Sequence, residues 1–151
     1  MTARAFHLAQ INVGRFRTAA DDPSLNDFMA ALDPINALAE RSPGFVWRLK
    51  DESGHATNIR AYEDSRMIVN LTVWESLETL RDFTYRSAHT GVLSRRSDWF
   101  EKLEGPHLAL WWTPGGSAPT AAEGVARIDH LARHGPSEHA FTFSRAFPAP
   151  A

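Results

Sequence analysis

The stretch "MIVNLTVW" at residues 67–74 decides how the rest of this chain is interpreted. It is rich in β-branched residues, which suit a pleated and buried surface, so it predicts a strand. Because successive side chains of a strand point to opposite faces, Asn70 and Thr72 are expected on one face and only apolar residues on the other. The residues that follow, "ESLETLRDFTY" at 75–85, predict a helix with Ser76 as its N-cap.

The same reasoning extends outward toward both ends of the chain. Alternation or short apolar runs predict strands at about 5–13, 45–50, 107–112 and 140–143, with another extended piece around 57–62. Helical spacing predicts helices within 21–44, over about 88–103 and over 120–135. Pro34 is expected to kink or restart the first helix, because proline lacks an N–H and clashes with the preceding turn. The tail after Phe147 is expected to be loose.

The order of these elements predicts an α+β fold. Strand, helix, strand, strand, helix, strand is the order of a ferredoxin-like sandwich, βαββαβ, here with an added C-terminal helix and short strand. The 151 residues are enough for one domain with a core, so we expect a single domain over residues 1–151. Both faces of the sheet carry apolar residues. We therefore expect helices on one face and a partner subunit on the other, which makes the protein a homodimer.

Composition excludes several classes of function. At 43% hydrophobic and 23% charged residues, with a formal net charge of -2, the chain is typical of a soluble domain without an electrostatic footprint for nucleic acid. No apolar run approaches the ~20 residues of a membrane span. The absence of cysteine excludes disulfides and thiolate chemistry. Together with the absence of a signal-like N-terminal segment, it predicts a cytoplasmic protein.

Several polar side chains fall on strand faces that should be covered, where an unpaired polar group costs about 1–3 kcal/mol. These are Gln10, Asn12, Asn70 and Thr72. With Trp74 and Trp111 they are candidates to line one cavity, in which amides orient a polar ligand between aromatic walls. The alternative is structural: the amides bond to the backbone or to each other at the dimer seam.

The stretch "FTYRSAHTGVLSRRSDWF" at residues 83–100 predicts a second part of the site. At helical spacing, His89 and Arg96 share an otherwise apolar stripe, with Tyr85 one turn earlier. Arginine can hold a carboxylate or phenolate, and histidine can move a proton near neutral pH. The alternative is that Arg96 pairs with an acid such as Glu75 or Asp98 and that His89 bonds a backbone carbonyl.

Five blocks of the chain, in this order, resemble the family of uncharacterised bacterial proteins called DUF3291. The blocks are residues 6–15 ("FHLAQINVGR"), 27–49, 69–100, 108–136 and 140–147. That family is similar to the antibiotic biosynthesis monooxygenases of the dimeric α/β-barrel superfamily. The resemblance implies ferredoxin-like subunits whose sheets pair into a barrel-like dimer, with a cavity between sheet and helices. Where the family commonly has a tyrosine, this chain has His107.

The resemblance implies a small-molecule enzyme or binder, and leaves open which. The reaction it suggests is cofactor-free oxygenation of an aromatic or polyketide-like substrate, with His89 and Arg96 as the catalytic pair. No flavin or nicotinamide motif is present, so we predict no cofactor. The alternative is a non-catalytic metabolite-binding or haem-binding dimer, with His89 or, second, His107 as the haem ligand.

The last predicted helix carries His130 and His134 at a spacing compatible with a metal ion. The chain has no "HExxH" pattern, and a solvated face at a helix C-terminus explains both histidines. We therefore predict no metal site.

Overall fold

The computed structural model describes residues 5–50, 62–87 and 89–150, without the side chains of His89, Val92 and Leu93. In this part of the chain the strands are β1 (Phe6–Arg15), β2 (Phe45–Arg48), β3 (Met67–Trp74) and β4 (Leu108–Pro114). They form one antiparallel sheet in the order β2-β3-β1-β4. This is the strand order of a ferredoxin-like sandwich, so the predicted α+β fold is confirmed.

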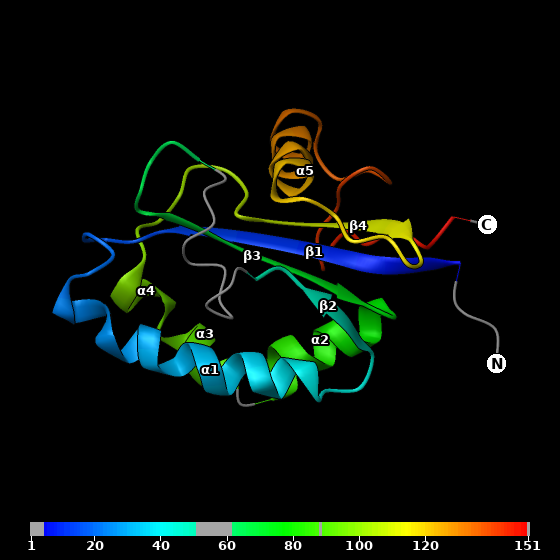
Figure 1. Ribbon diagram of the computed structural model, residues 1–151. Coiled ribbons are helices and arrows are strands. Elements are labelled where there is room, and N and C mark those ends of the chain that lie inside the picture. Colours follow the sequence, from blue (N-terminus) through cyan, green and yellow to red (C-terminus); the bar gives the residue numbers. More distant parts are fainter. Residues whose placement is uncertain (1–4, 51–61, 88, 151) are drawn as a thin grey trace.

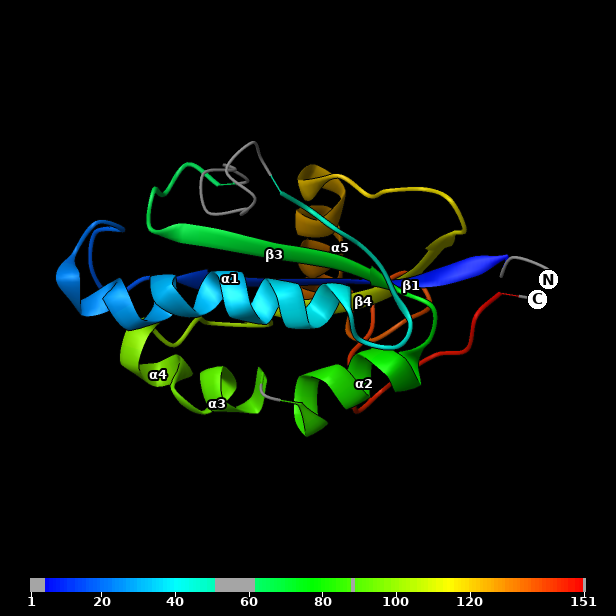
Figure 2. The same ribbon diagram turned by 60° about the horizontal axis from the view of Figure 1, so that its bottom comes forward.

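Helices cover both faces of the sheet. On one face lie α1 (Asn26–Glu40), which follows the 3-10 helix η1 (Pro23–Leu25), together with α2 (Leu77–Arg86), α3 (His89–Ser94) and α4 (Arg96–Trp99) (Figure 1). The helix α5 (Ala121–His134) lies alone on the other face (Figure 1). Seen from the helical side, α1 runs beside the row formed by α2, α3 and α4 (Figure 2).

The stretch from β3 into α2 folds as its sequence predicts. β3 spans Met67–Trp74, and α2 begins directly after Ser76. The Thr79 backbone N–H donates to Ser76 Oγ at 3.2 Å. The Ser76 backbone N–H in turn donates to Thr79 Oγ1 at 3.3 Å. This reciprocal capping satisfies two backbone donors that a helix start otherwise leaves unpaired, so α2 starts at a defined residue.

The face that α5 covers holds the largest buried cluster of the described residues. Strand residues such as Ile11, Leu71 and Trp111 are almost fully buried there against Ile128 and Leu131 of α5. The expectation that a partner subunit covers this face is wrong, because the chain supplies its own cover. The homodimer itself stays a prediction.

The single helix predicted over 88–103 is wrong. The structure has two short helices, α3 and α4, and Phe100 is extended, with φ -119° and ψ 144°. The backbone beyond α4 pairs with β1 and the residues after it: Arg17 N donates to Trp99 O, and Glu101 N to Arg15 O, both at 2.9 Å. These long-range hydrogen bonds override a weak local helix propensity.

The end of α4 at Trp99 divides the apolar stripe from which a single helix over 88–103 was predicted. Trp99 and Phe100 pack with Phe16 and Phe28 in one cluster, on the side of the sheet that carries α1. Leu103, also assigned to the stripe, packs against the cluster beneath α5. A stripe that is read as one helix face therefore supplies two different layers of the fold.

Other boundaries differ in detail. α1 continues through Pro34 without a restart, although proline removes one helical hydrogen bond. The strand predicted at 45–50 ends at Arg48. The last predicted strand is reduced to a bridge in which Phe141 and Leu110 exchange two backbone hydrogen bonds of 2.8 Å. The extended piece predicted around 57–62 falls almost wholly outside the described residues.

Candidate functional site

A cavity of about 250 Å³ lies between the sheet and the helices of its α1 side. Its floor is formed by β1 and β3, which are direct neighbours in the sheet. Apolar side chains of α1, such as Leu32 and Ile35, and Leu80 and Phe83 of α2 form its walls. The site thus has a polar side and an apolar side, which is the usual composition of a small-molecule pocket.

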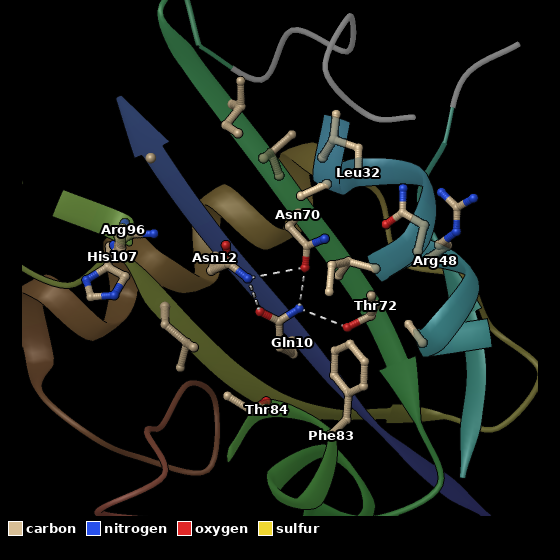
Figure 3. Close-up of a pocket in the computed structure, with 18 of the residues that line it drawn as sticks. Gln10, Asn12, Leu32, Arg48, Asn70, Thr72, Phe83, Thr84, Arg96 and His107 are labelled. Atoms are coloured by element: carbon tan, nitrogen blue, oxygen red, sulfur yellow. Dashed lines mark hydrogen bonds between the residues drawn. The ribbon is translucent and has the colours of Figure 1, made fainter. Parts of the chain in front are cut away.

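A hydrogen-bonded network of amides forms the floor. Gln10 and Thr72 face each other across the β1–β3 ladder, as do Asn12 and Asn70. Gln10 Nε2 donates to Thr72 Oγ1 at 2.8 Å and to Asn70 Oδ1 at 3.1 Å. Asn12 Nδ2 donates to Gln10 Oε1 at 2.6 Å and to Asn70 Oδ1 at 3.2 Å (Figure 3). These contacts hold the four side chains in one orientation.

The network leaves two polar atoms available. Among the described residues, Asn70 Nδ2 has no hydrogen-bond partner, and neither has Asn12 Oδ1. Gln10 is only 4% exposed, whereas the Asn70 side chain is open to solvent. The floor therefore offers one donor and one acceptor to a bound molecule, while its buried members are already satisfied.

Trp74 supports the floor from the side, because it lies on the same face of β3 as Thr72. It is fully buried, and its Nε1 donates to Thr72 Oγ1 at 2.9 Å. The ring contacts Phe83 with the centroids 5.1 Å apart, and Phe83 lines the cavity. Trp74 is thus a positioning residue, and the prediction that it lines the cavity is wrong.

Arg96, at the start of α4, lines one end of the cavity. Its Nη2 donates to Val13 O at 3.0 Å, and its guanidinium lies over the Phe100 ring, 5.1 Å from the centroid. Burial lowers the pKa of Arg96 below its usual range. In the described part of the chain no carboxylate pairs with Arg96, and Asp98, one predicted partner, pairs instead with Arg95 at 3.0 Å.

His107 lies at the same end of the cavity (Figure 3). More than a third of His107 is exposed to solvent, and its backbone O accepts a hydrogen bond of 2.9 Å from Val13 N. Burial, and then the positive charge of Arg96, lower the pKa of the His107 imidazole. From the sequence, His107 was expected only as a second candidate haem ligand. The sequence feature that could have predicted this position is that His107 directly precedes β4, the strand that pairs with β1.

A second arginine lies at the opposite end. Arg48 of β2 lines the cavity, and its Nε lies 3.5 Å from Glu40 Oε2 of α1 (Figure 3). Tyr85 also lines the cavity, but its side chain is 52% exposed and contacts Phe143, with the ring centroids 5.5 Å apart. The two rings belong to the rim of the site. Sequence reasoning missed Arg48, because a single arginine on a short strand carries no spacing signal.

The structure gathers most of the predicted site but not all of it. Trp111 lies on the other face of the sheet, beneath Arg127, whose guanidinium is 5.4 Å from the ring centroid. The prediction that Trp111 lines the cavity is wrong, because Trp111 pairs with Ala9 and shares its face, while Gln10 pairs with Leu110. His89 begins α3, and its side chain lies outside the described part.

The rings of His130 and His134 are 4.5 Å apart, centroid to centroid, and His139 lies 4.4 Å from His130. Across residues 5–50, 62–87 and 89–150, no group of three or more His, Cys, Asp or Glu side chains is placed to hold a metal ion. Over the same residues, every helix is too short or too polar to cross a membrane.

The fold and the site together define a class: a ferredoxin-like α+β domain with a cavity between its sheet and one helical layer. The chain belongs to the family described as "Domain of unknown function (DUF3291)", whose model matches residues 7–151. The predicted family is thus confirmed. No curated protein matches the chain.

Solved structures share the general fold at low sequence identity. A protein of Nitrosomonas europaea, named provisionally as an antibiotic biosynthesis monooxygenase, is 11% identical, with a TM-score of 0.47 over 80% of this chain and 99% of its own. A Pseudomonas aeruginosa protein is 11% identical, with a TM-score of 0.49 over 77% and 100%. A Chloroflexus aurantiacus protein, provisionally named in the same way, is 14% identical, with a TM-score of 0.44 over 76% and 98%. These similarities say nothing about what this chain binds.

Proposed function

We propose that the protein binds a small, flat, acidic organic molecule, aromatic or polyketide-like, in the cavity between β1, β3, α1 and α2. The observation that carries the proposal is Arg96. A half-buried arginine is nearly always paired with an acid, yet no described carboxylate pairs with this one. A ligand oxygen with negative charge is the partner that such a site lacks.

The remaining lining supports the same class of ligand. No aspartate or glutamate occurs among the described residues that line the cavity, whereas Arg48, Arg96 and His107 do. The apolar walls favour a ring system, and the free amide atoms of Asn12 and Asn70 favour one with carbonyl or hydroxyl groups. The volume of about 250 Å³ is just below the usual range of about 300–1,000 Å³ for ligand pockets, so the ligand is small.

For the reaction, we propose cofactor-free oxygenation. In this chemistry the substrate anion supplies the electrons, one atom of O₂ enters the substrate as a quinone carbonyl, and the other leaves as water. The protein needs a base, a clamp for the anion and a site that excludes water. Oxygen uptake with a bound phenol, followed by mass spectrometry of the product, tests this reaction. If the phenol is recovered unchanged, the oxygenation proposal is wrong and only the binding proposal stands.

The alternative, a non-catalytic carrier, uses the same cavity and the same anion clamp. Its haem version requires a porphyrin, which is larger than a cavity of about 250 Å³. A haem titration followed at the Soret band separates this version from a carrier of smaller metabolites. The absence of a Soret shift would remove haem from the possibilities.

The binding proposal is tested with two probes of equal shape, 2-naphthoate and the neutral 2-naphthamide, measured by calorimetry. We expect 2-naphthoate to bind at least about tenfold more tightly, since that factor corresponds to about 1.4 kcal/mol, less than one charge-assisted hydrogen bond. The preference should vanish in Arg96→Ala. Arg127→Ala is the matched control, because Arg127 also donates to a backbone carbonyl and lies over an aromatic ring, but on the opposite face. Equal affinity for both probes in the unaltered protein would refute the proposal.

A further inference from the structure

We propose that His139 is a proton-sensitive latch: the neutral imidazole holds the C-terminal strap, residues 136–147, on α5, and protonation releases it. The strap also supplies Phe143 to the rim of the cavity. Its release therefore opens the rim and speeds both the entry and the exit of a ligand. This last step rests on the proposed function and adds a regulation of the same cavity.

The latch is a contact between α5 and the strap. Arg127 Nη1 lies 2.9 Å from His139 Nδ1 and 2.9 Å from the His139 backbone O. A guanidinium can only donate hydrogen bonds, so Nδ1 must be the imidazole nitrogen that carries no hydrogen. A proton on Nδ1 would turn this hydrogen bond into a contact between two donors, both of them positively charged.

Arg127 is held by other contacts, so His139 is the residue that moves on protonation. Arg127 Nη2 donates to Glu123 Oε2 at 3.0 Å, and the guanidinium lies 5.4 Å from the centroid of the Trp111 ring. His139 is exposed and has room to leave.

The hydrogen bonds between α5 and the strap depend on this one contact. Among the described residues, only Arg127 of α5 hydrogen-bonds to the strap. The neighbouring hydrogen bonds stay within the strap: Ser137 N donates to Ala140 O at 2.9 Å, and His139 N donates to Ser137 Oγ at 3.2 Å. Loss of the contact therefore leaves the start of the strap without a hydrogen bond to α5.

The charged and titratable groups around His139 set the pH at which the latch opens. Among the described residues these are Glu123, Arg127, His130 and His134 of α5, and Glu138, its neighbour in the chain. The His130 ring lies between the other two imidazoles, with its centroid 4.4 Å from that of His139 and 4.5 Å from that of His134. Burial lowers the pKa of His139, Arg127 and His130 lower it further, and Glu123 acts in the opposite direction. The imidazole is therefore neutral at pH 7, and the latch opens below pH 6.5.

The strap joins the latch to the cavity. It leaves α5, passes the outer edge of β4 and reaches α2 on the other face of the sheet (Figures 1 and 2). At this edge, Phe141 exchanges two backbone hydrogen bonds of 2.8 Å with Leu110. His139 and Phe143 stand two residues before and two residues after Phe141, and the Phe143 ring contacts Tyr85 of α2. Loosening at His139 therefore reaches the rim through the three residues between them.

The latch is tested in the ligand-free protein by hydrogen exchange at pH 7.5 and 5.0, corrected for the intrinsic pH dependence of exchange. We expect the protection of residues 140–147 to fall at least about fivefold at pH 5.0 relative to that of α1. In His139→Gln, whose neutral amide still accepts from Arg127, the strap should stay protected at both pH values. In His139→Lys, which keeps a positive charge there, it should be loose at both. His134→Gln, which alters an exposed histidine of α5, is the matched control and should behave like the unaltered protein.

The effect on the cavity is tested with 2-naphthoate, whose entry and release are followed by stopped-flow fluorescence at pH 7.5. At this single pH, His107 and the probe keep one protonation state in all variants. We expect faster entry and release in His139→Lys than in His139→Gln, by similar factors, because an open rim speeds both and leaves the dissociation constant nearly unchanged. Arg127→Ala, without the donor of the latch, should exchange the ligand as fast as His139→Lys and keep the preference for 2-naphthoate.

Equal strap protection at both pH values in the unaltered protein, or an unchanged pH response in His139→Gln, would overturn the latch. Equal ligand exchange rates in His139→Lys and His139→Gln would overturn its effect on the cavity. Failure of 2-naphthoate to bind would refute the proposed function and this effect together, while hydrogen exchange of the ligand-free strap still decides the latch.

Discussion

Removing the Arg96 side chain should cost little stability, because the arginine is not part of a described ion pair. Arg96→Ala removes a charge-assisted hydrogen bond to Val13 O, worth about 1.5–3 kcal/mol, and a contact with the Phe100 ring, worth about 0.5–1 kcal/mol. It also removes the cost of keeping an uncompensated charge half-buried, which acts in the opposite direction. We therefore expect a net loss of about 1–2 kcal/mol in the free energy of unfolding.

An arginine buried with a carboxylate behaves differently. Its removal strands the acid and costs about 3–5 kcal/mol. Urea unfolding, followed by tryptophan fluorescence, separates the two cases. For a chain of this size, a loss of about 1–2 kcal/mol lowers the melting temperature by about 2–8 °C.

Ligand addition completes the experiment. At 100 times its dissociation constant, 2-naphthoate should raise the stability of the unaltered protein by about 2.7 kcal/mol. It should leave the Arg96→Ala melting temperature nearly unchanged. Arg127→Ala should respond to the ligand as the unaltered protein does. A loss of 3 kcal/mol or more in ligand-free Arg96→Ala would refute this reasoning and assign the residue to the structure.

The remaining predictions concern packing, capping and pH. Gly14→Ala should cost about 1–3 kcal/mol in urea unfolding, because a Cβ there would lie 2.6 Å from the Phe100 ring; a neutral effect would contradict the packing described. Ser76→Ala should cost about 0.5–2 kcal/mol by removing the cap of α2, and an unchanged midpoint would argue against the cap. The folded protein lowers the pKa of His107 below 6.5, so the unfolded chain binds the proton first and stability should fall as the pH drops from 6.5 to the folded-state pKa. His107→Gln should weaken this dependence in urea midpoints measured across that range, and an unaltered pH profile would contradict it. Light scattering tests the predicted homodimer, and a monomer at all concentrations would remove it.

The floor of the site was predictable from sequence because strand alternation is a local property. Gln10, Asn12, Asn70 and Thr72 lie on the expected faces, and an antiparallel pairing of β1 and β3 places them together. The prediction failed for Trp111, whose face depends on its pairing partner. With Trp111 opposite Ala9, the ring points to α5, a consequence of register that alternation within one strand does not reveal.

The cationic end of the site depends on contacts between distant segments. Arg96 was a candidate because of a helical stripe that the structure divides, yet it lines the cavity because its guanidinium is held on Val13 O. His107 and Arg48 carry no motif, and their place follows from which strands pair and which helices cover them.

Local sequence patterns are enough to predict the order of the elements, the two faces of β1 and β3, and the start of α2, since each depends on residues a few positions apart. The other features depend on contacts between segments that are distant in the chain. Backbone pairing of residues 15–17 with 99–101 ended the predicted helix, and α5 covered the face assigned to a partner subunit. The physical reason is that periodicity records which side chains share a face, whereas the free energy of long-range pairing and burial selects what that face contacts.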